Sequence, residues 1–416
     1  MSVIASESTD EVVRFSGWRI LGLATIALGL TGPGQTIGVS VFIDHFADDL
    51  DLSKNAVAAG YAVGTLSGSL MMPTVGRWVD HFGVRRAMTT IAILFSVALV
   101  YMSGVQGLIS LTIGFWFIRM LGQGSLSLVS TVAVSLWFEQ RRGLALGLAM
   151  TISSAMMALV PVALTFTIAE FGWRTAWLVA ASTVAMIVIP IAAFGMIDRP
   201  ATVGQFPDGI VPDAAHDTKL ASRPSLTRSE ALRTRSFWAL AIASGSASML
   251  STGLNFHQIS LLGESGFSET EAAVMFLPQV LGTSIGSPAM GIVLDKVGTR
   301  LAPMATLIML SATLLLAGSA SSTTAVIAYA TWFGLTAGSV RTLGAALIPK
   351  WFGIDHIGAI QGAATFIGVL ASAAGPIAFS LTASGLGGFR ETAIVWAAVP
   401  LVGAVFALTN RPPEAQ

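Results

Sequence analysis

Two arginines lie inside long apolar stretches of the sequence and are the residues best suited to binding a charged small molecule. Arg119 lies within the apolar run 108–136, and Arg341 lies within the run 323–349. A central arginine in a membrane helix costs about 2.5–3.5 kcal/mol on insertion scales, so each guanidinium needs an interior partner. We interpret both as ligands for a substrate carboxylate. In the alternative interpretation, Arg119 is neutralised by carbonyls and polar side chains, and the Arg341 side chain reaches toward the membrane interface.

Uncharged polar residues in other apolar runs form a second group of candidates. Pro33 lies between Gly32 and Gly34 in the run 18–43. Proline and glycine together weaken a helix and free carbonyl groups, which is tolerable only against a cavity or against protein. The residues expected to line a substrate cavity beside the arginines are Gln35, Gln123, Asn255, Gln279 and Gln361. The alternative for each position is packing among small residues.

Three titratable residues are candidates for carrying a coupled proton. His257 is the one histidine inside an apolar run, and histidine titrates near physiological pH. All 22 acidic residues fall in loops or near the ends of apolar runs, and Asp44 and Glu264 are the nearest of them to the interior. The alternatives are a hydrogen-bonded packing histidine and two solvated loop charges.

No signature of a catalytic centre, a metal site or a cofactor is present. The chain has no cysteine, which excludes thiolate metal sites and thiol chemistry, and it lacks HExxH zinc spacing and a phosphate-binding P-loop. Its formal net charge is zero, so nothing favours nucleic acid as a partner. We therefore expect no catalytic residue, no metal and no cofactor.

The elements that must position these residues are membrane-spanning helices. Charged residues make up 11% of the chain, against about 25% in soluble domains, and the mean hydropathy is +0.76. A span needs roughly 20 apolar residues. The sequence predicts an all-α polytopic membrane protein with twelve spans, at 18–43, 56–75, 87–105, 108–136, 143–168, 174–197, 237–263, 270–292, 301–320, 323–349, 358–383 and 391–409.

An internal repeat divides the chain into two halves. The pattern G-x3-D-x2-G-x-R occurs at Gly76–Arg85 and again at Gly291–Arg300, and each equivalent residue differs by 215 positions. Such a charged segment cannot lie in hydrocarbon, so both copies are expected to be tight loops between spans. We predict an N-terminal six-helix bundle at 1–197, a proline-containing linker at 198–236 and a C-terminal six-helix bundle at 237–416. Within the linker, Thr227 and Glu230 have the spacing of a capping box that begins a short helix through Arg235.

Lysines and arginines predict the orientation in the membrane. The side that holds the termini and the linker carries 17 of the 22 basic residues, and the opposite side carries Lys54, Arg174 and Arg390. The positive-inside rule then places both termini in the cytoplasm of a multi-pass protein of the cell membrane.

The two six-helix halves and the repeated loop motif resemble the major facilitator superfamily over nearly the whole chain. Shorter stretches are similar to its bacterial monocarboxylate-transporter-like members: Arg119–Gly124, Trp137-Phe138 with Arg141–Gly143, Phe256–Gln258 and Gly204–Gly209. The resemblance implies alternating access, in which two bundles rock about a central site and one chain suffices. It also implies a latch at the cytoplasmic side, formed by Asp80 with Arg85 and Arg86 and by Asp295 with Arg300. The carboxylates of Asp80 and Asp295 can also accept hydrogen bonds from neighbouring helix termini.

These observations predict a secondary transporter of a small organic anion, foremost a monocarboxylate, that moves together with a proton. Proton symport removes the cost of moving an anion against an inside-negative potential, about 2.3 kcal/mol per charge per 100 mV. The alternative is a proton-coupled efflux antiporter for hydrophobic or cationic compounds, which would require an intramembrane carboxylate. A membrane enzyme lacks its motifs here, whereas a sensor that binds ligand without flux stays open.

Overall fold

A computed structural model of the chain describes residues 15–211, 225–297 and 299–409. Within these ranges the regular structure is entirely helical, which confirms the predicted all-α class. Several sequence-based predictions fall outside the described residues: the linker part 212–224 with Lys219 and Arg223, the loop residue Gly298, and the terminal residues Arg14 and Arg411.

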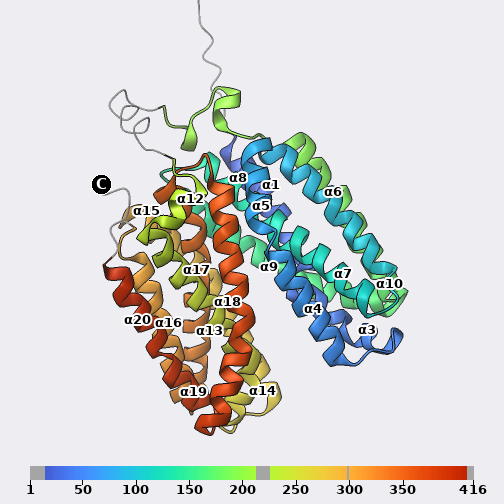
Figure 1. Cartoon of the computed structure of the whole chain (residues 1–416), viewed down its shortest axis with the longest axis vertical. Coiled ribbons are helices and arrows are strands. Elements are labelled where there is room, and N and C mark those ends of the chain that lie inside the picture. The colour runs from blue at the N-terminus through green and yellow to red at the C-terminus, as the bar shows by residue number, and fades with distance from the viewer. Residues whose placement is uncertain (1–14, 212–224, 298, 410–416) are drawn as a thin grey trace, which may run out of the picture.

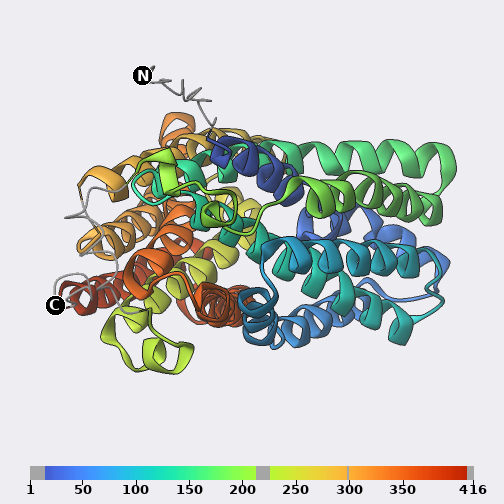
Figure 2. The same cartoon turned by 90° about the horizontal axis from the view of Figure 1, so that it is seen from above.

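The helices fall into two groups that follow the order of the chain (Figures 1 and 2). The first group comprises α1 (Gly17–Gly29), η1 (Gly32–Gly34), α2 (Thr36–Val39), η2 (Ser40–Phe42), α3 (Ile43–Asp49), α4 (Lys54–Ser69), α5 (Met72–Phe82), α6 (Val84–Ser103), α7 (Leu108–Ile118), η3 (Arg119–Leu126), α8 (Ser127–Trp137), α9 (Arg142–Phe171), α10 (Trp173–Pro190) and η4 (Ile191–Gly195). The second comprises α13 (Arg235–Gly263), α14 (Glu269–Val274), α15 (Phe276–Lys296), α16 (Ala302–Ser319), α17 (Thr323–Phe352), α18 (Ile357–Leu386), α19 (Phe389–Trp396) and α20 (Ala398–Leu408). We call these groups the first and second halves.

By length and composition, nine helical segments of the described chain could cross a membrane, and a tenth if the bent pair Gly17–Gly34 and Thr36–Asp49 is one span. Two of the twelve predicted segments fall short for identifiable reasons. The second is broken between α4 and α5, which have 16 and 11 residues. The tenth, α17, is 30 residues long but contains Arg341, several glycines and threonines, which lower its hydropathy. All twelve predicted apolar segments are nevertheless largely helical.

The structure corrects the loops that we expected at both copies of the repeated motif. In the second copy, α15 runs through Lys296 and contains Gly291 and Asp295. The first copy differs in the same way. We expected a loop over Gly76–Arg86, but α5 runs through Phe82 and only Gly83 separates it from α6. Gly83 has φ 81° and ψ 166°, a conformation open essentially to glycine alone, so a single residue makes the turn. Since no proline or second glycine interrupts 77–82, the helix continues past the apolar run and carries Asp80 with it.

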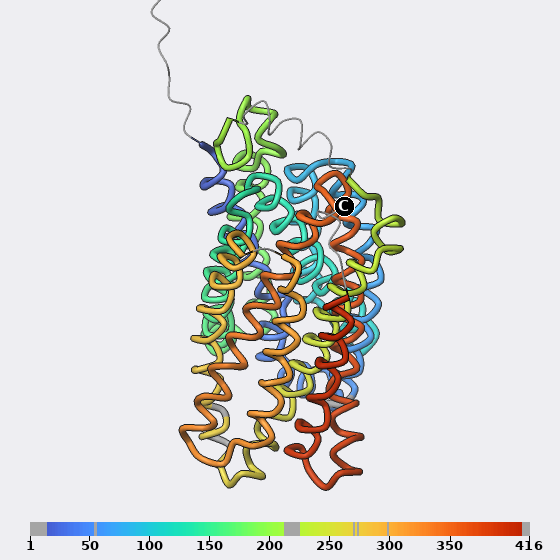
Figure 3. Tube along the Cα trace, turned by 90° about the vertical axis from the view of Figure 1, so that its left-hand side faces the viewer, coloured from blue at the N-terminus to red at the C-terminus, as the bar shows by residue number. Residues whose placement is uncertain are grey.

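The halves meet at the end that carries the linker and diverge at the other end (Figure 1), and Figure 3 shows the described linker segments at one end of the molecule. At the linker end, α5 packs on α18 and α9 packs on α15. Both contacts are backbone to backbone, because Gly76 faces Gly358 and Gly143 faces Gly291 with no space for a Cβ atom. We call these the two glycine contacts. The molecule is therefore closed at the linker end and open at the far end.

The described parts of the linker are fastened to both halves. The carboxylate of Asp208, which lies within η6 (Pro207–Gly209), accepts hydrogen bonds from the backbone N–H groups of Glu139, Gln140 and Arg141. On the other side of the undescribed part, Leu226 N–H donates to the Phe352 carbonyl. The segment before 212 thus belongs with the first half, and the segment after 224 belongs with the second.

The predicted capping box at Thr227 is confirmed. It begins α12 (Arg228–Arg233), with the Thr227 hydroxyl and N–H both bonded to the Glu230 carboxylate. These hydrogen bonds from Thr227 hold the pKa of Glu230 below its usual value. The helix ends at Arg233 instead of Arg235, because Thr234 adopts an extended conformation and caps α13.

Candidate functional site

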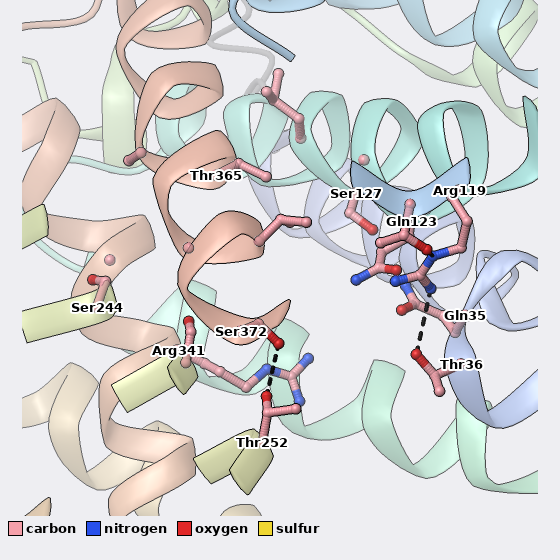
Figure 4. A pocket seen from close by; sticks show the side chains of 18 of the residues that line it. Gln35, Thr36, Arg119, Gln123, Ser127, Ser244, Thr252, Arg341, Thr365 and Ser372 are labelled. Atoms are coloured by element: carbon pink, nitrogen blue, oxygen red, sulfur yellow. Dashed lines mark hydrogen bonds between the residues drawn. The ribbon is translucent and has the colours of Figure 1, made fainter. Parts of the chain in front are cut away.

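A cavity of about 690 Å³ lies between the two halves, and both contribute to its wall (Figure 4). Polar groups come from α4, η3 and α8 on one side and from α13, α17 and α18 on the other. Among the described residues that line it, Arg119 and Arg341 are the only charged ones, and no carboxylate is present. The other polar lining residues include Gln35, Thr36, Tyr61, Thr65, Gln123, Thr131, Thr252, Gln361 and Ser372.

Arg119 is held by groups of its own half. Its Nε donates to the Thr65 hydroxyl at 3.0 Å, and its Nη1 donates to the Gly34 carbonyl at 3.2 Å and, at the 3.5 Å limit, to the Thr36 hydroxyl. The Tyr61 ring lies 5.0 Å from the guanidinium carbon, a cation–π distance. The side chain is 7% exposed. These contacts leave Nη2 without a partner among the described residues.

Local breaks in two helices place Arg119 at the cavity wall. Gly32–Gly34 forms a short 3-10 turn, so the Gly34 carbonyl is not used within an α-helix and accepts from Arg119. Arg119 itself begins η3, a π-helical stretch in which the Ser125 hydroxyl donates to the Met120 carbonyl five residues earlier. Such wide turns are rare and cluster at functional sites. Here the wide turn directs both Arg119 and Gln123 into the cavity.

Arg341 faces the cavity from the opposite half and reaches across it. Its Nη1 donates to the Ser154 hydroxyl on α9 at 3.0 Å, and its Nη2 lies 3.9 Å from the Met150 sulfur on the same helix. The side chain is exposed, and since it lines the cavity, it is exposed to the cavity. Two arginines separated by 222 positions in the sequence thus share one space (Figure 4).

The structure brings some of the five predicted amide side chains to the cavity and leaves others outside. Gln35, Gln123 and Gln361 line it, and Gln361 Nε2 donates to the Thr131 hydroxyl of the other half at 2.8 Å. Gln123 Oε1 and Gln361 Oε1 are buried without a partner among the described residues. Asn255 and Gln279 do not line the cavity; they bond to each other at 3.0 Å. On α13, Ser248, Thr252 and Phe256 follow a four-residue spacing into the cavity, and Asn255 points about 100° away from Phe256.

None of the three candidates for proton coupling lines the cavity. His257 Nε2 donates to the Pro376 carbonyl at 3.1 Å, and its ring stacks on Phe389. The Glu264 carboxylate accepts from the N–H groups of Phe389 and Arg390 at the start of α19, so it caps that helix. Asp44 is exposed in the first turn of α3. His257 is the nearest of the three, because its neighbours Phe256 and Pro376 are lining residues.

Sequence reasoning missed three residues that hold the arginines in place. Tyr61 and Thr65 contact Arg119, and Ser154 contacts Arg341. Tyr61 and Thr65 are four residues apart, so they share one face of α4, and Tyr61 is one of only three tyrosines in the chain. That spacing was the available signal. No sequence pattern indicated Ser154, because its partner Arg341 comes from the other half of the chain.

Asp80 and Asp295 have partners other than the arginines that we expected. Asp80 accepts from the N–H groups of Gly358 and Ala359 at 2.7 and 2.8 Å, at the start of α18. Asp295 accepts from Gly143 and Leu144, both at 2.9 Å, at the start of α9. Each carboxylate therefore crosses from one half to a helix N-terminus of the other, where the helix dipole favours an anion. The contacts with helix termini agree with our expectation. The expected pairing of these carboxylates with Arg85, Arg86 and Arg300 does not occur among the described residues.

The basic residues of the first loop bind elsewhere. Arg85 Nε donates to the Ala193 carbonyl, and its backbone N–H donates to Asp198. No ion pair of Arg86 or Arg300 occurs among the described residues. The reason is geometric: Arg85 and Arg86 lie beyond the Gly83 turn on α6, whereas Asp80 lies before it on α5 and faces α18.

We expect Asp80→Ala to weaken closure at the linker end. Each hydrogen bond to a charged group contributes about 1.5–3 kcal/mol, and two are lost here while the glycine contacts remain. Because the chain has no cysteine, Phe82→Cys and Val297→Cys would be the only attachment sites for a pair of spin labels, one on each half. The distance distribution between the labels should gain a longer component. Asp48→Ala, at the far end, is the control and should leave the distribution unchanged.

A sequence model of the Major Facilitator Superfamily matches residues 21–278 and 255–416. The chain is similar to human Monocarboxylate transporter 14, with 28% identity over 193 residues, which are 46% of this chain and 37% of that protein. Mouse Monocarboxylate transporter 11 is 27% identical over 191 residues, 44% of this chain and 40% of that protein. The match thus spans about two fifths of these relatives. Bovine Monocarboxylate transporter 13 is 23% identical over 350 residues, 82% of this chain and 76% of that protein.

Solved structures agree with this result at the level of the fold. The human organic anion transporter MFSD10 superposes with a TM-score of 0.69 and 16% identity, over 94% of this chain and 99% of that one. The proton:xylose symporter XylE superposes with a TM-score of 0.71 and 14% identity, over 94% of each chain. Two helical halves, a cavity between them and a family match across both halves agree. The chain therefore belongs to the Major Facilitator Superfamily as a multi-pass membrane protein, and its relatives support the monocarboxylate-transporter-like branch.

Proposed function

We propose that this protein transports a small organic anion, foremost a monocarboxylate, across the cell membrane by alternating access and with a proton. The observation that carries the proposal is the charge of the cavity: two guanidinium groups face it, and no carboxylate does among the described lining residues. An anion is therefore attracted to the cavity, whereas a cation would meet two like charges. Relatives named as monocarboxylate transporters and a structural neighbour named as an organic anion transporter support the same substrate class.

Five lining residues and two carboxylates at the linker end have roles in this proposal. Arg119 and Arg341 bind the carboxylate, and the amides of Gln35, Gln123 and Gln361 orient the rest of the molecule by hydrogen bonds. Asp80 and Asp295 close the linker end in one state and release the helix termini of α18 and α9 in the other. One chain encloses the cavity, so the transporter works as a monomer.

The orientation follows from the distribution of basic residues, with the linker end and both termini in the cytoplasm. The state described here, closed at the linker end and open at the far end, then faces outward (Figure 1). In this orientation, anions in the external medium have access to the cavity and to its two arginines.

We expect uptake of a labelled monocarboxylate by proteoliposomes to rise as the external pH falls. The reason is that a symported proton is more available at low pH and cancels the charge of the anion. The assay is initial uptake of radiolabelled lactate against external pH, with an uncoupler as the control that removes the proton gradient. If uptake depends neither on the external pH nor on the uncoupler, the proposal of proton coupling is wrong. If no carboxylate is transported, the proposal of anion transport is wrong.

Substitutions separate the three candidates for the proton carrier. In His257→Gln, we expect the rise at low pH to flatten, because the imidazole adjoins lining residues Phe256 and Pro376. In Glu264→Gln and Asp44→Asn, the pH profile should keep its shape, because Glu264 caps α19 and Asp44 is exposed in the first turn of α3. A flattened profile in Glu264→Gln with a normal one in His257→Gln would reverse this assignment.

A further inference from the structure

We propose that the preferred cargo is a dianion, a dicarboxylate with one carboxylate on Arg119 and the other on Arg341. This inference rests on the proposed transport of a small organic anion, and within that class it replaces the monocarboxylate with a dicarboxylate as the preferred cargo. Its basis is that the two guanidinium groups stand in one cavity on opposite halves, and each lacks an anionic partner (Figure 4). Ion pairs among the described residues include Arg174 with Asp49 and Arg199 with Asp355, and both lie outside the cavity.

Both arginines have hydrogen-bond donors that no described residue occupies. A guanidinium carries five N–H groups. Arg119 uses Nε and Nη1 for Thr65, Gly34 and Thr36, so its Nη2 is free for one carboxylate. Arg341 uses one donor for Ser154 and lies near the Met150 sulfur, so its Nε is free for the other. Both guanidinium groups can thus donate hydrogen bonds to a carboxylate and keep the contacts that position them.

Closure of the cavity makes the second charge matter. While the far end is open, water solvates Arg341, whose side chain is exposed to the cavity. When the halves close around a cargo, that water leaves, and an unpaired guanidinium in a dry cavity is strongly unfavourable. A monocarboxylate neutralises one of the two cations, whereas a dicarboxylate neutralises both. The dianion therefore favours the occluded state in a way that a monoanion does not.

The position of the arginines on opposite halves would also let a dicarboxylate connect the two halves. Arg119 is fixed within the first half, and Arg341 extends from the second half to α9 of the first. A cargo that binds both links the halves directly across the cavity. About 690 Å³ is within the usual range of small-molecule sites and exceeds what a short monocarboxylate needs.

The test compares cargo pairs of equal chain length on the purified full-length protein at pH 7.5. Binding of succinate and glutarate is measured by calorimetry against butyrate and valerate, which keep one carboxylate and replace the other with a methyl group. We expect the dicarboxylates to bind about tenfold more tightly or better, as one additional charge-assisted contact implies. In Arg341→Gln this ratio should fall close to one, because the second carboxylate of succinate or glutarate then has no guanidinium partner. Arg233→Gln, an exposed arginine on α12, should keep the wild-type ratio.

The outcomes distinguish this inference from the proposed function. If butyrate binds as tightly as succinate in the wild type, the dianion inference is wrong and the organic anion proposal stands. If succinate binds more tightly than butyrate but Arg341→Gln keeps the wild-type ratio of their affinities, the assignment of Arg341 to the second carboxylate is wrong. If no carboxylate binds, both proposals fail. Since Arg341 is exposed to the cavity, its substitution removes little packing, and the wild-type comparison needs no variant at all.

Discussion

Arg119→Gln is expected to reduce carboxylate uptake by about a hundredfold or more, the largest effect of any cavity substitution. The variant loses the cation that attracts the anion and the donors that hold the Gly34 carbonyl and the Thr65 hydroxyl. Charge-assisted hydrogen bonds contribute about 1.5–3 kcal/mol each, and each 1.4 kcal/mol is tenfold in affinity. The measurement is initial uptake of labelled lactate or succinate by proteoliposomes, normalised to the amount of reconstituted protein.

Controls separate lost binding from lost structure. Arg233→Gln makes the same chemical change on an exposed side chain and should transport normally. Arg119→Lys keeps the charge but cannot reproduce the geometry of the guanidinium, so partial uptake is expected. Thermal unfolding in detergent reports whether Arg119→Gln is folded. A folded Arg119→Gln variant that retains uptake within about threefold of the wild type would contradict the assignment of Arg119.

Gly76→Val is expected to prevent closure of the linker end. A Cβ at Gly76 would collide with the backbone carbonyl of Gly358, and backbone on both sides leaves no flexible side chain to yield. Forcing extra atoms into such a contact costs about 1–3 kcal/mol or more, so the closed linker end should become about tenfold rarer or worse. The spin labels at Phe82→Cys and Val297→Cys should report mainly the longer distance, and uptake should fall in parallel.

Gly22→Val is the matched control for this variant. Gly22 is an exposed helical glycine in α1, and a Cβ there meets nothing within 4 Å. It should leave both the label distances and the uptake unchanged. Normal closure in Gly76→Val would mean that the glycine contact does not hold the linker end. Gly291→Val should act like Gly76→Val, because its Cβ would meet the Gly143 carbonyl at the equivalent contact.

The linker end and the middle of the molecule connect the two halves by different contacts. At the linker end, the glycine contacts and the carboxylates of Asp80 and Asp295 hold the halves together by short, polar and backbone-mediated interactions. In the middle, Arg341 and Gln361 cross between halves through single hydrogen bonds. The cavity therefore lies where a cargo can alter the balance between open and closed states.

Hydropathy and the internal repeat predicted the all-α membrane fold correctly, because each apolar segment of about 20 residues has to form helix in a bilayer whatever surrounds it. The same reasoning identified Arg119 and Arg341 as candidate site residues, since a charge deep in an apolar run is costly and its depth can be estimated from the sequence. The sequence also revealed the freed carbonyl near Pro33, because proline and glycine act on the local backbone. The division into domains at 197 and 237 stays a prediction.

Only the tertiary structure decided which residues share the cavity and which partners they have. Gln123 and Gln361 face it while Asn255 and Gln279 pair outside it, because the rotation of each helix depends on its neighbours. Asp80 and Asp295 bind helix N-termini 278 and 152 positions away instead of nearby arginines. Depth in the membrane and helix formation are local consequences of composition, so the sequence by itself determined them. The direction of a side chain and the partner it meets result from packing between distant segments, and no local pattern encodes that.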